Sequence, residues 1–405
     1  MAHQGRATAR RDPGLIVRAG RTACQCGNGR IRAAFPLLVD AARRVSHPRG
    51  VTATNLPPDL EAAPHRRYNP LLDEWVLVSP GRTNRPWSGQ QESTPDEELP
   101  RYDPACYLCP RNRRANGEVN PDYERTFVFT NDFAALRPDT PTSTFESGLL
   151  RAEGERGTCR VLCFSPRHDL TIARMAEGDV REIVDVWATQ STELGQRYRW
   201  VQVFENRGAA MGASNPHPHG QIWAGTALPV LAAREDAAQR AHREATGRVL
   251  LLDYVAQETG GPRVVIENDE WLVVVPFWGI WPFETLIIPK RPAQRLADLD
   301  GPRRDALAAT LIELLVRSDN LFRHPFPYSL GWHQAPFDGD DQTHWQLHGH
   351  LLPPLLRSAT VRKFIAGYEL LAETQRDITP EEAAARLRNV PAVHYRDDVA
   401  QRGGT

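Results

Sequence analysis

Short apolar runs bounded by turn residues dominate the first part of the chain beyond residue 65. Four of these runs are rich in β-branched and aromatic residues and therefore predict strands. They are residues 74–79, 125–130, 160–165 and 201–205. Between the last two, residues 179–194 have apolar side chains at helical spacing, which predicts a helix that covers a sheet.

The same order of elements recurs in the second part. Three apolar runs predict strands, a stripe of leucines at 303–317 predicts a helix, and a last strand at 344–350 carries a histidine cluster. The three runs are residues 264–268, 271–276 and 285–289. Because helices are segregated from the strands, the pattern favours an α+β fold with mainly antiparallel sheets and covering helices.

The recurrence predicts two similar halves, 61–230 and 231–395, each ending in a histidine-bearing strand. At 405 residues the chain exceeds the usual limit of roughly 250–300 residues for one hydrophobic core. We therefore expect either two lobes or one extended sheet system.

Residues 1–60 form an extension of a different character. The first 50 residues contain ten arginines and two aspartates, and no helical or strand period is sustained. The apolar stretch at 33–39 contains a proline and precedes Asp40, which argues against a signal peptide. We predict a disordered extension, or a start codon placed too early. Cys24 and Cys26 have no companion ligands nearby and are assigned no role.

The composition is that of a globular protein in water. Apolar residues make up 41% of the chain, yet no apolar run approaches 18 residues. A net charge of −1 gives no bulk attraction to nucleic acid or anionic membranes. We expect neither as a partner, and we expect a cytoplasmic location. Only two basic residues are lysines, Lys290 and Lys363.

One loop concentrates the candidate chemistry. Residues 206–224 read NRGAAMGASNPHPHGQIWA, in which small and turn-forming residues predict a loop that ends where the histidines begin a strand. Residues two apart in an extended segment face the same way, so His217, His219 and Gln221 are expected to share one face. Pro218 restricts the backbone around His217. Gly220 is expected to leave room for a bulky anion.

Cys106 and Cys109 have the spacing at which two thiolates bind one tetrahedral zinc ion. Two ligands do not complete such a site, and His168 and His217 are the candidates for the other two. A zinc ion with four protein ligands would be structural and would hold the histidine loop against the cysteine loop. The alternative is a pair of buried or redox-active cysteines, which is our interpretation of Cys159 and Cys163.

His219 is then free to act as a nucleophile or a base. An imidazole nucleophile needs one ring nitrogen held as a donor, so that the other presents its lone pair. Gln221 can donate an amide hydrogen to a phosphoryl oxygen without adding charge, and Ser214 can add a hydroxyl group. In the alternative interpretation these side chains are polar core residues or all bind metal.

A second histidine cluster lies in the C-terminal half. His348 and His350 are two residues apart on the last predicted strand and are expected to face the same way. With His333 and a carboxylate they would form a site suited to iron or zinc. His344 has no assigned role.

Six stretches of the sequence carry a family resemblance. They are NRGAAMGASNPHPHGQIW, HRRYNPLLDEWVLVSPGRTNRPW, FTNDFAAL, CFSPRH, GWHQAPF and HWQLHGHLLPPLLRSATVRKFIAGYELLAETQRD. On these stretches the chain resembles the galactose-1-phosphate uridylyltransferases, the nucleotide-transferring branch of the histidine-triad superfamily, and the similarity covers about residues 60–395.

The resemblance implies a ping-pong reaction of galactose metabolism, in the Leloir pathway. His219 attacks the α-phosphorus of UDP-glucose, glucose 1-phosphate leaves, and galactose 1-phosphate then accepts the uridylyl group to give UDP-galactose. A phosphoramidate suits this relay because imidazole is a good nucleophile and, when protonated, a good leaving group. Histidine-triad hydrolases have a third histidine where this chain has Gln221, which favours transfer over hydrolysis.

The resemblance also implies substrate contacts at matching positions. They are Arg82, Arg85, Leu108, Asn131, Asp132, Asn206, Lys363, Phe364, Tyr368, Glu369 and Gln375. Leu108, Asn131 and Asp132 match the uridine pocket, Asn206 and Ser214 match phosphate contacts, and the others match residues near the hexose and its phosphate. In the family, part of the segment 363–375 serves the neighbouring subunit. A homodimer is therefore implied.

Glu235 matches the carboxylate that joins the second histidine cluster in the family, and the resemblance makes this second metal, iron or zinc, structural. Two other functions compete with the leading one. One is another nucleotidyl transferase or phosphorylase of the superfamily with a different nucleotide, and the other is a metal-stabilised nucleotide-binding protein without chemistry. The presence of His219, Gln221 and Lys363 favours an enzyme.

Overall fold

The computed structural model describes residues 56–80, 98–358, 361–363 and 365–397. Arg82, Arg85 and Phe364 lie outside these residues, as does most of the predicted extension 1–60. Within the last few residues of that extension, Pro58 begins helix α1 (Pro58–Ala62). Among the described residues, no helix is long and apolar enough to cross a membrane.

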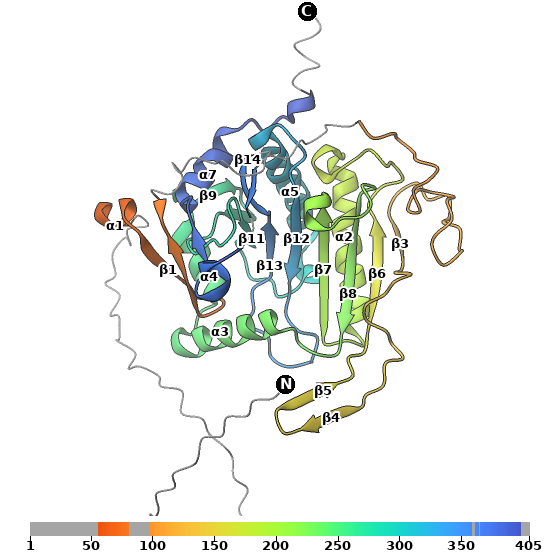
Figure 1. The fold of residues 1–405 in the computed structure, drawn as a ribbon, viewed down its shortest axis with the longest axis horizontal. Helices are drawn as coiled ribbons and strands as arrows, with labels where there is room; N and C mark the ends of the chain where they lie inside the picture. Colours follow the sequence, from red (N-terminus) through yellow and green to blue (C-terminus); the bar gives the residue numbers. More distant parts are fainter. Residues whose placement is uncertain (1–55, 81–97, 359–360, 364, 398–405) are drawn as a thin grey trace, which may run out of the picture. The chain divides into compact units, whose positions relative to one another are not determined.

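A nine-stranded sheet organises the described chain (Figure 1). Its strands in spatial order are β3 (Phe127–Thr130), β6 (Gly157–Cys163), β8 (His219–Gly225), β7 (Trp200–Arg207), β12 (Tyr328–His333), β13 (His348–Leu352), β11 (Thr285–Pro289), β10 (Trp271–Val274) and β9 (Val264–Glu267). Every neighbouring pair is antiparallel. The α+β prediction is confirmed, and of the two expected arrangements the chain forms one extended sheet.

The strand order repeats within this sheet. The order β3-β6-β8-β7 recurs from the opposite side as β10-β11-β13-β12, and the two sets meet where β7 pairs with β12. A long helix precedes the equivalent strand in each set: α2 (Glu177–Gly195) comes before β7, and α5 (Gly301–Phe322) comes before β12. This repeat agrees with the recurrence of elements in the sequence.

The strands and both helices predicted from the apolar pattern are present, although the bounds of several differ by a few residues. The last strand begins at His348 rather than at residue 344. Before it, the Gln346 amide group donates to the carbonyl oxygens of Pro289 and Arg291, at 3.0 and 3.1 Å. The Gln346 backbone nitrogen donates to Gln239 Oε1 at 3.0 Å. Side-chain hydrogen bonds, with a backbone bond from Leu347 to the carbonyl oxygen of Ala293 at 2.7 Å, therefore hold this stretch in place of a regular strand ladder.

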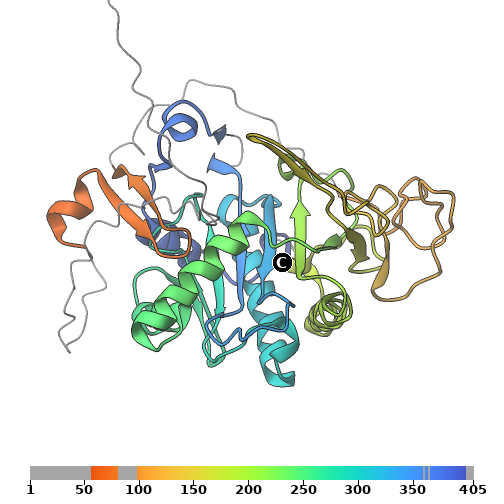
Figure 2. The ribbon, with the colours of Figure 1, turned by 90° about the horizontal axis from the view of Figure 1, so that it is seen from below.

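Helices α2 and α5 pack against each other on one face of the sheet (Figure 2). The largest core lies between these helices and the sheet, where Ile183, Trp187 and Leu311 of the helices meet Val203 and Ile222 of the strands. All five side chains are buried. Burial of an apolar side chain of this size contributes roughly 1.5–3 kcal/mol, so this face is the main source of stability.

The opposite face of the sheet is covered unevenly. Over the C-terminal strands, Leu251 of α4 (Leu250–Glu258) packs with Leu272, Val274 and Ile288, so β10 is buried on both faces. On β8, by contrast, every second residue is only partly buried, beginning with His219 and Gln221. The N-terminal part of this face is therefore open to a ligand.

Smaller elements surround the large sheet. A small sheet consists of β1 (His65–Asn69), β2 (Glu74–Val78) and β16 (Gln375–Arg376), and two hairpins pair β4 (Thr144–Ser147) with β5 (Leu150–Glu153) and β14 (Leu355–Ser358) with β15 (Val361–Lys363). Three further helices are α3 (Val230–Thr246), α6 (Tyr368–Leu371) and α7 (Pro380–Asn389). The 3₁₀ turns are η2 (Ile172–Arg174), η3 (Ala209–Met211) and η4 (Leu296–Asp298).

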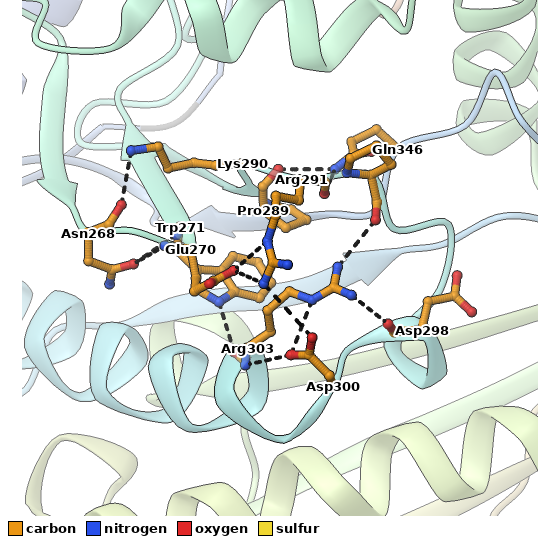
Figure 3. Close-up of polar contacts among 11 residues, drawn as sticks. Asn268, Glu270, Trp271, Pro289, Lys290, Arg291, Asp298, Asp300, Arg303 and Gln346 are labelled. Atoms are coloured by element: carbon orange, nitrogen blue, oxygen red, sulfur yellow. Dashed lines mark hydrogen bonds and ion pairs between the residues drawn. The ribbon is translucent and has the colours of Figure 1, made fainter.

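A polar network joins the edge strands to the start of α5 (Figure 3). Trp271 Nε1 donates to the carbonyl oxygen of Arg303 at 2.9 Å, and Asp300 accepts from the Arg303 backbone nitrogen at 3.0 Å as the helix N-cap. Lys290 pairs with Glu267 at 3.0 Å and donates to the carbonyl oxygen of Asn268 at 3.0 Å. Lys290 thus stabilises the sheet edge.

Gly220 faces the core rather than a ligand. A Cβ atom there would lie 2.8 Å from Phe164 Cζ and 3.0 Å from the carbonyl oxygen of Phe204. The expectation that Gly220 makes room for an anion is therefore wrong. Its missing side chain accommodates Phe164, because alternate residues of β8 face opposite sides of the sheet.

The substitution Gly220→Ala is predicted to destabilise the protein by roughly 1–3 kcal/mol, because the added methyl group overpacks the core at Phe164. Urea unfolding followed by circular dichroism measures the change. Gly178→Ala is the matched control, since nothing lies within 4 Å of its added Cβ and it belongs to α2. Equal stability of the two variants would contradict the packing argument.

Candidate functional site

Four potential metal ligands meet in the N-terminal half. Cys106 and Cys109 come from the loop before β3, His168 from the loop after β6, and His217 from the bend before β8, and their ligand atoms lie within 4.8 Å of one another. Cys109 Sγ is 3.7 Å from His168 Nδ1 and 3.5 Å from His217 Nδ1. Bonds of about 2.3 Å to sulfur and 2.05 Å to nitrogen in a tetrahedral zinc site separate these ligands by about 3.6 Å. The donor set and spacing fit such a site.

The orientation of His217 is fixed by its second ring nitrogen. His217 Nε2 donates to the carbonyl oxygen of Ser165 at 2.9 Å, which leaves Nδ1 as the acceptor that faces Cys109. Tyr123 lies 3.1 Å from the same Nε2 and donates to the carbonyl oxygen of Leu108 at 2.6 Å. Contacts of this kind orient metal-binding histidines and strengthen them as ligands.

Asn215 links the histidine loop to the cysteine loop. Its Nδ2 lies 3.3 Å from Cys106 Sγ, and its Oδ1 accepts from the His217 backbone nitrogen at 2.9 Å. The sequence reasoning missed Asn215 and Tyr123, because neither belongs to a spacing pattern of metal ligands. The position of Asn215 two residues before His217 is the one available signal, since asparagine often bonds the backbone two residues ahead.

Burial sets the protonation of these ligands. It raises the pKa of the Cys109 thiol to about 11 and lowers the pKa of His217 to about 3. The imidazole is therefore neutral at physiological pH, as a metal ligand must be. The thiol becomes a favourable thiolate only beside a cation.

The expectation that His217 shares a face with His219 and Gln221 is wrong. Strand β8 begins at His219, so alternation of side chains starts there and does not extend to His217. His217 lies in a bend and is buried, with 1% of its surface exposed, whereas His219 and Gln221 are half-buried on the open face. Two histidines that are adjacent in the motif thus point to different sites.

His219 is held in one tautomer. Its Nδ1 lies 2.7 Å from the carbonyl oxygen of His217, which can only accept, so Nδ1 carries the hydrogen and Nε2 presents its lone pair. Burial lowers the pKa of His219, and the bond to His217 opposes that shift. This tautomer is the one that an imidazole nucleophile requires.

A cavity of about 420 Å³ lies beside His219. The predicted phosphate contacts Asn206 and Ser214 also line it, and Asn206 Oδ1 accepts from the Ser329 hydroxyl at 2.7 Å. Arg174, Arg207 and Arg396 contribute to the same wall. Asp169, Glu205 and Asp319 line the cavity as well. Arg207 is paired with Asp319 and Arg174 with Asp397, so carboxylates balance the guanidinium groups there.

The predicted uridine contacts lie near Gln221. Asn131 Nδ2 is 3.5 Å from Gln221 Oε1, which places Asn131 beside the open face of β8. Asp132 accepts from Arg114 Nη1 at 3.2 Å. Leu108 is buried beneath this region, with 1% of its surface exposed. The structure therefore brings these three residues to the part of the chain that holds His219.

The residues predicted to bind the sugar lie in other elements. Gln375 belongs to β16, in the small sheet with β1 and β2, and not to the sheet that holds His219. Tyr368 is exposed on α6, while Glu369 pairs with Arg376 at 2.8 Å. Lys363 ends β15, and its side chain lies outside the described part of the chain.

A second group of potential metal ligands forms in the C-terminal half. Glu235 of α3 lies 2.7 Å from His333 Nδ1, 3.4 Å from His348 Nε2 and 3.8 Å from His350 Nε2. The two Nε2 atoms of His348 and His350 are buried without a hydrogen-bond partner. Buried polar atoms are rarely left so. Three imidazoles and a carboxylate with unmet acceptors fit a divalent metal.

His348 of the second group repeats the local geometry of His219. His348 Nδ1 lies 2.8 Å from the carbonyl oxygen of Gln346, as His219 Nδ1 lies 2.7 Å from that of His217. His348 begins β13 as His219 begins β8. The unassigned His344 bonds Asp236 at 2.7 Å, beside Glu235 on α3.

A buried charged network contributes to the lining of the cavity. Arg207 forms two bonds to Asp319, at 3.0 and 3.1 Å, and Tyr328 donates to Glu205 at 3.0 Å. Burial raises the pKa of Glu205 from its ordinary value of 4.5 to about 7, against the opposing effect of Arg207. No sequence pattern singles out Glu205, because its pKa is raised by burial, which depends on the packing of the folded chain.

Comparison with known proteins adds sequence and fold relationships. Residues 54–229 match the galactose-1-phosphate uridyl transferase N-terminal domain, and residues 235–399 match the C-terminal domain of the same family. A galactose-1-phosphate uridylyltransferase of Haemophilus influenzae is 54% identical over 336 residues, covering 82% of this chain and 96% of that protein. One of Rattus norvegicus is 53% identical over 336 residues, covering 82% and 89%.

A solved uridylyltransferase structure has the same fold. It is 26% identical to this chain, with a TM-score of 0.64, and the similarity covers 80% of this chain and 97% of that structure. Sequence and fold therefore agree over nearly the whole of each relative.

The substitution Cys106→Ser is predicted to remove one metal ion per chain and to lower stability, because a hydroxyl group is a poor replacement for a thiolate ligand. Elemental analysis of the purified protein measures the metal, and thermal unfolding measures stability. Cys159→Ser serves as the control, since Cys159 lies outside both ligand groups. Unchanged metal content in Cys106→Ser would contradict the ligand assignment.

The free energy of unfolding is predicted to fall as the pH rises from about 4.5 to above 7. The reason is that the folded protein binds the Glu205 proton more tightly than the unfolded chain does, so losing that proton destabilises the fold. The raised pKa corresponds to a loss of up to roughly 3 kcal/mol at pH 8. Glu205→Gln removes this contribution while keeping an acceptor for Tyr328. Urea unfolding measures the free energy of unfolding of both proteins at pH 5 and pH 8. The variant should be more stable relative to the wild type at pH 8 than at pH 5. A pH-independent difference would contradict the prediction.

Proposed function

This chain belongs to the galactose-1-phosphate uridylyltransferase family and is a nucleotidyltransferase, and we propose that it works through a covalent uridylyl group on His219. The reaction moves the uridylyl group from UDP-glucose to galactose 1-phosphate and yields glucose 1-phosphate and UDP-galactose. The observation that carries the proposal is the 2.7 Å bond from His219 Nδ1 to the His217 carbonyl oxygen. It leaves Nε2 as a nucleophile beside the cavity.

Two half-reactions share this nitrogen. In the first, the Nε2 lone pair forms a bond to the α-phosphorus of UDP-glucose, and the bond to the bridging oxygen breaks, so glucose 1-phosphate leaves with that electron pair. In the second, a phosphate oxygen of galactose 1-phosphate attacks the same phosphorus, and the P–N bond breaks to restore His219. The imidazole is thus unchanged after each cycle, and no water needs to enter the site.

Three side chains act on the phosphoryl oxygens in this proposal. Gln221 donates from its amide group on the same face of β8 as His219, and Ser214 and Asn206 donate from the wall of the cavity. Neutral donors stabilise the charge that develops on the phosphoryl oxygens without holding the product as tightly as a cation would. Arg174 and Arg396 line the same cavity, and in this proposal they bind the second phosphate group.

The substrate pocket extends in two directions from this centre. We assign uridine to Leu108, Asn131 and Asp132. The assignment of the hexose and its phosphate to Arg82, Arg85, Lys363, Phe364, Tyr368, Glu369 and Gln375 rests on the family resemblance. Because Gln375 belongs to a sheet other than that of His219, we propose that this segment serves the site of a second subunit in a homodimer.

Two metals have structural roles in this proposal. Cys106, Cys109, His168 and His217 would hold zinc, which supplies a rigid link between the cysteine loop and the strand that starts at His219. Glu235, His333, His348 and His350 would hold iron or zinc in the C-terminal half. The two halves are assigned to 61–230 and 231–395, in agreement with the repeated strand order. Four free cysteines in the described chain support a reducing, cytoplasmic location.

Incubation with UDP-glucose is predicted to add one uridylyl group per chain, and His219→Ala is predicted to abolish the addition because no other group holds a lone pair at that position. Intact-mass measurement detects the adduct, and galactose 1-phosphate should discharge it as UDP-galactose. ADP-glucose as the donor tests the competing nucleotide. An adduct in His219→Ala, or none in the wild type, would overturn the proposal.

A further inference from the structure

Gln221 is held by a neighbour that the proposed mechanism does not use. The indole nitrogen of Trp223 donates to Gln221 Oε1 at 2.9 Å. An indole N–H can only donate, so the Gln221 oxygen must be the atom that faces it, and the amide orientation is fixed by chemistry. Asn131 Nδ2 approaches the same oxygen at 3.5 Å, from a second direction.

Because the Gln221 oxygen faces Trp223, the Gln221 nitrogen Nε2 points the other way. Gln221 Nε2 has no hydrogen-bond partner among the described residues. Its two hydrogens are therefore available to a ligand on the open face of β8, where His219, Gln221 and Trp223 alternate with core residues. With the amide reversed, an oxygen atom would face the phosphoryl oxygens and repel them, and the indole N–H would face an NH₂ group.

Trp223 is itself held in place. Its ring meets Phe204 edge to face, with the centroids 5.6 Å apart and an interplanar angle of 77°. Phe204 is the register partner of Gln221 across β7 and β8, so the aromatic pair and the glutamine lie on adjacent strands. Edge-to-face packing of this kind restricts the indole to one orientation.

We propose that Trp223 is a positioning residue of the transfer reaction. Because Trp223 donates to the Gln221 oxygen, it fixes the orientation of the amide group. The amide hydrogens then point towards the phosphoryl group that His219 attacks. In this proposal Trp223 acts through Gln221 and not on the reacting atoms themselves. This inference rests on the proposed function of His219 and Gln221.

The test is Trp223→Phe, which removes the indole donor and keeps an aromatic ring against Phe204. The rate constant of uridylylation at saturating UDP-glucose, followed by rapid quench, is expected to fall about 10-fold, the equivalent of one net hydrogen bond. The effect should lie in the rate constant rather than in the UDP-glucose concentration for half-saturation, because the donors act on charge that develops in the transition state.

Coupling to Gln221 separates positioning from general damage. Gln221→Ala alone should lower the rate constant by roughly 100-fold or more, as the loss of a transition-state donor does. Adding Trp223→Phe to Gln221→Ala should lower it no further, because the amide group through which Trp223 acts is absent. Independent, multiplicative losses in the double variant would overturn the inference.

Trp271→Phe provides the matched control. Trp271 also donates from its indole nitrogen at 2.9 Å, to the carbonyl oxygen of Arg303, but it lies on β10 in the network of Figure 3. Trp271 is fully buried, so the variant should lose stability while keeping the wild-type rate of uridylylation. If Trp271→Phe slowed the reaction as much as Trp223→Phe, the effect would be structural and the inference would fail.

The outcomes also separate this inference from the proposed function. If the wild type forms no adduct, or His219→Ala still forms one, the proposed function fails first. If the wild type forms the adduct and Trp223→Phe forms it at the same rate, the role of Trp223 alone is overturned.

Discussion

The hydrogen bond between His219 Nδ1 and the His217 carbonyl oxygen is the contact on which the site depends. It selects the tautomer of His219, and it comes from the residue whose own side chain joins the group of potential metal ligands. A shift of His217 would therefore move both the carbonyl that orients the nucleophile and the start of β8. Asn215, which bonds both Cys106 and the His217 backbone, adds a second link between the same two loops.

The C-terminal half uses the same contact for a different purpose. His348 is oriented by the carbonyl oxygen of Gln346, just as His219 is oriented by that of His217. There, however, Glu235 of α3 lies 3.4 Å from the free nitrogen of His348, and His333 and His350 surround the same carboxylate. One strand start thus presents its histidine to a cavity, and the equivalent strand start presents its histidine to a buried carboxylate.

The difference between the two halves follows from what covers the sheet. Both share the core under α2 and α5, but α4 buries the second face of the C-terminal strands, while the same face of β8 stays partly open. On that open face the polar residues are not independent. Trp223 holds Gln221, and the ring of Trp223 rests on Phe204, so an apolar contact supports the orientation of a polar group.

The sequence by itself predicted the α+β class, helices α2 and α5, and most strands of the large sheet, although not β12. It also predicted the cysteine and histidine ligands of both groups, whereas Glu235 came from the family resemblance. These depend on local period and spacing: two cysteines three residues apart lie close in any fold, and His348 and His350 share a face wherever they form a strand. The family could also be recognised, because long stretches such as NPHPHGQIW carry chemistry that few other sequences share.

Tertiary structure alone decided the directions of the side chains. It turned His217 away from His219, because β8 begins two residues later than the alternation assumed, and it placed Gly220 against Phe164 in the core. It also brought Asn215 to Cys106 and raised the pKa of Glu205, effects that arise from residues distant in the chain. Local period fixes which residues are neighbours on a strand, but only packing fixes what each one faces.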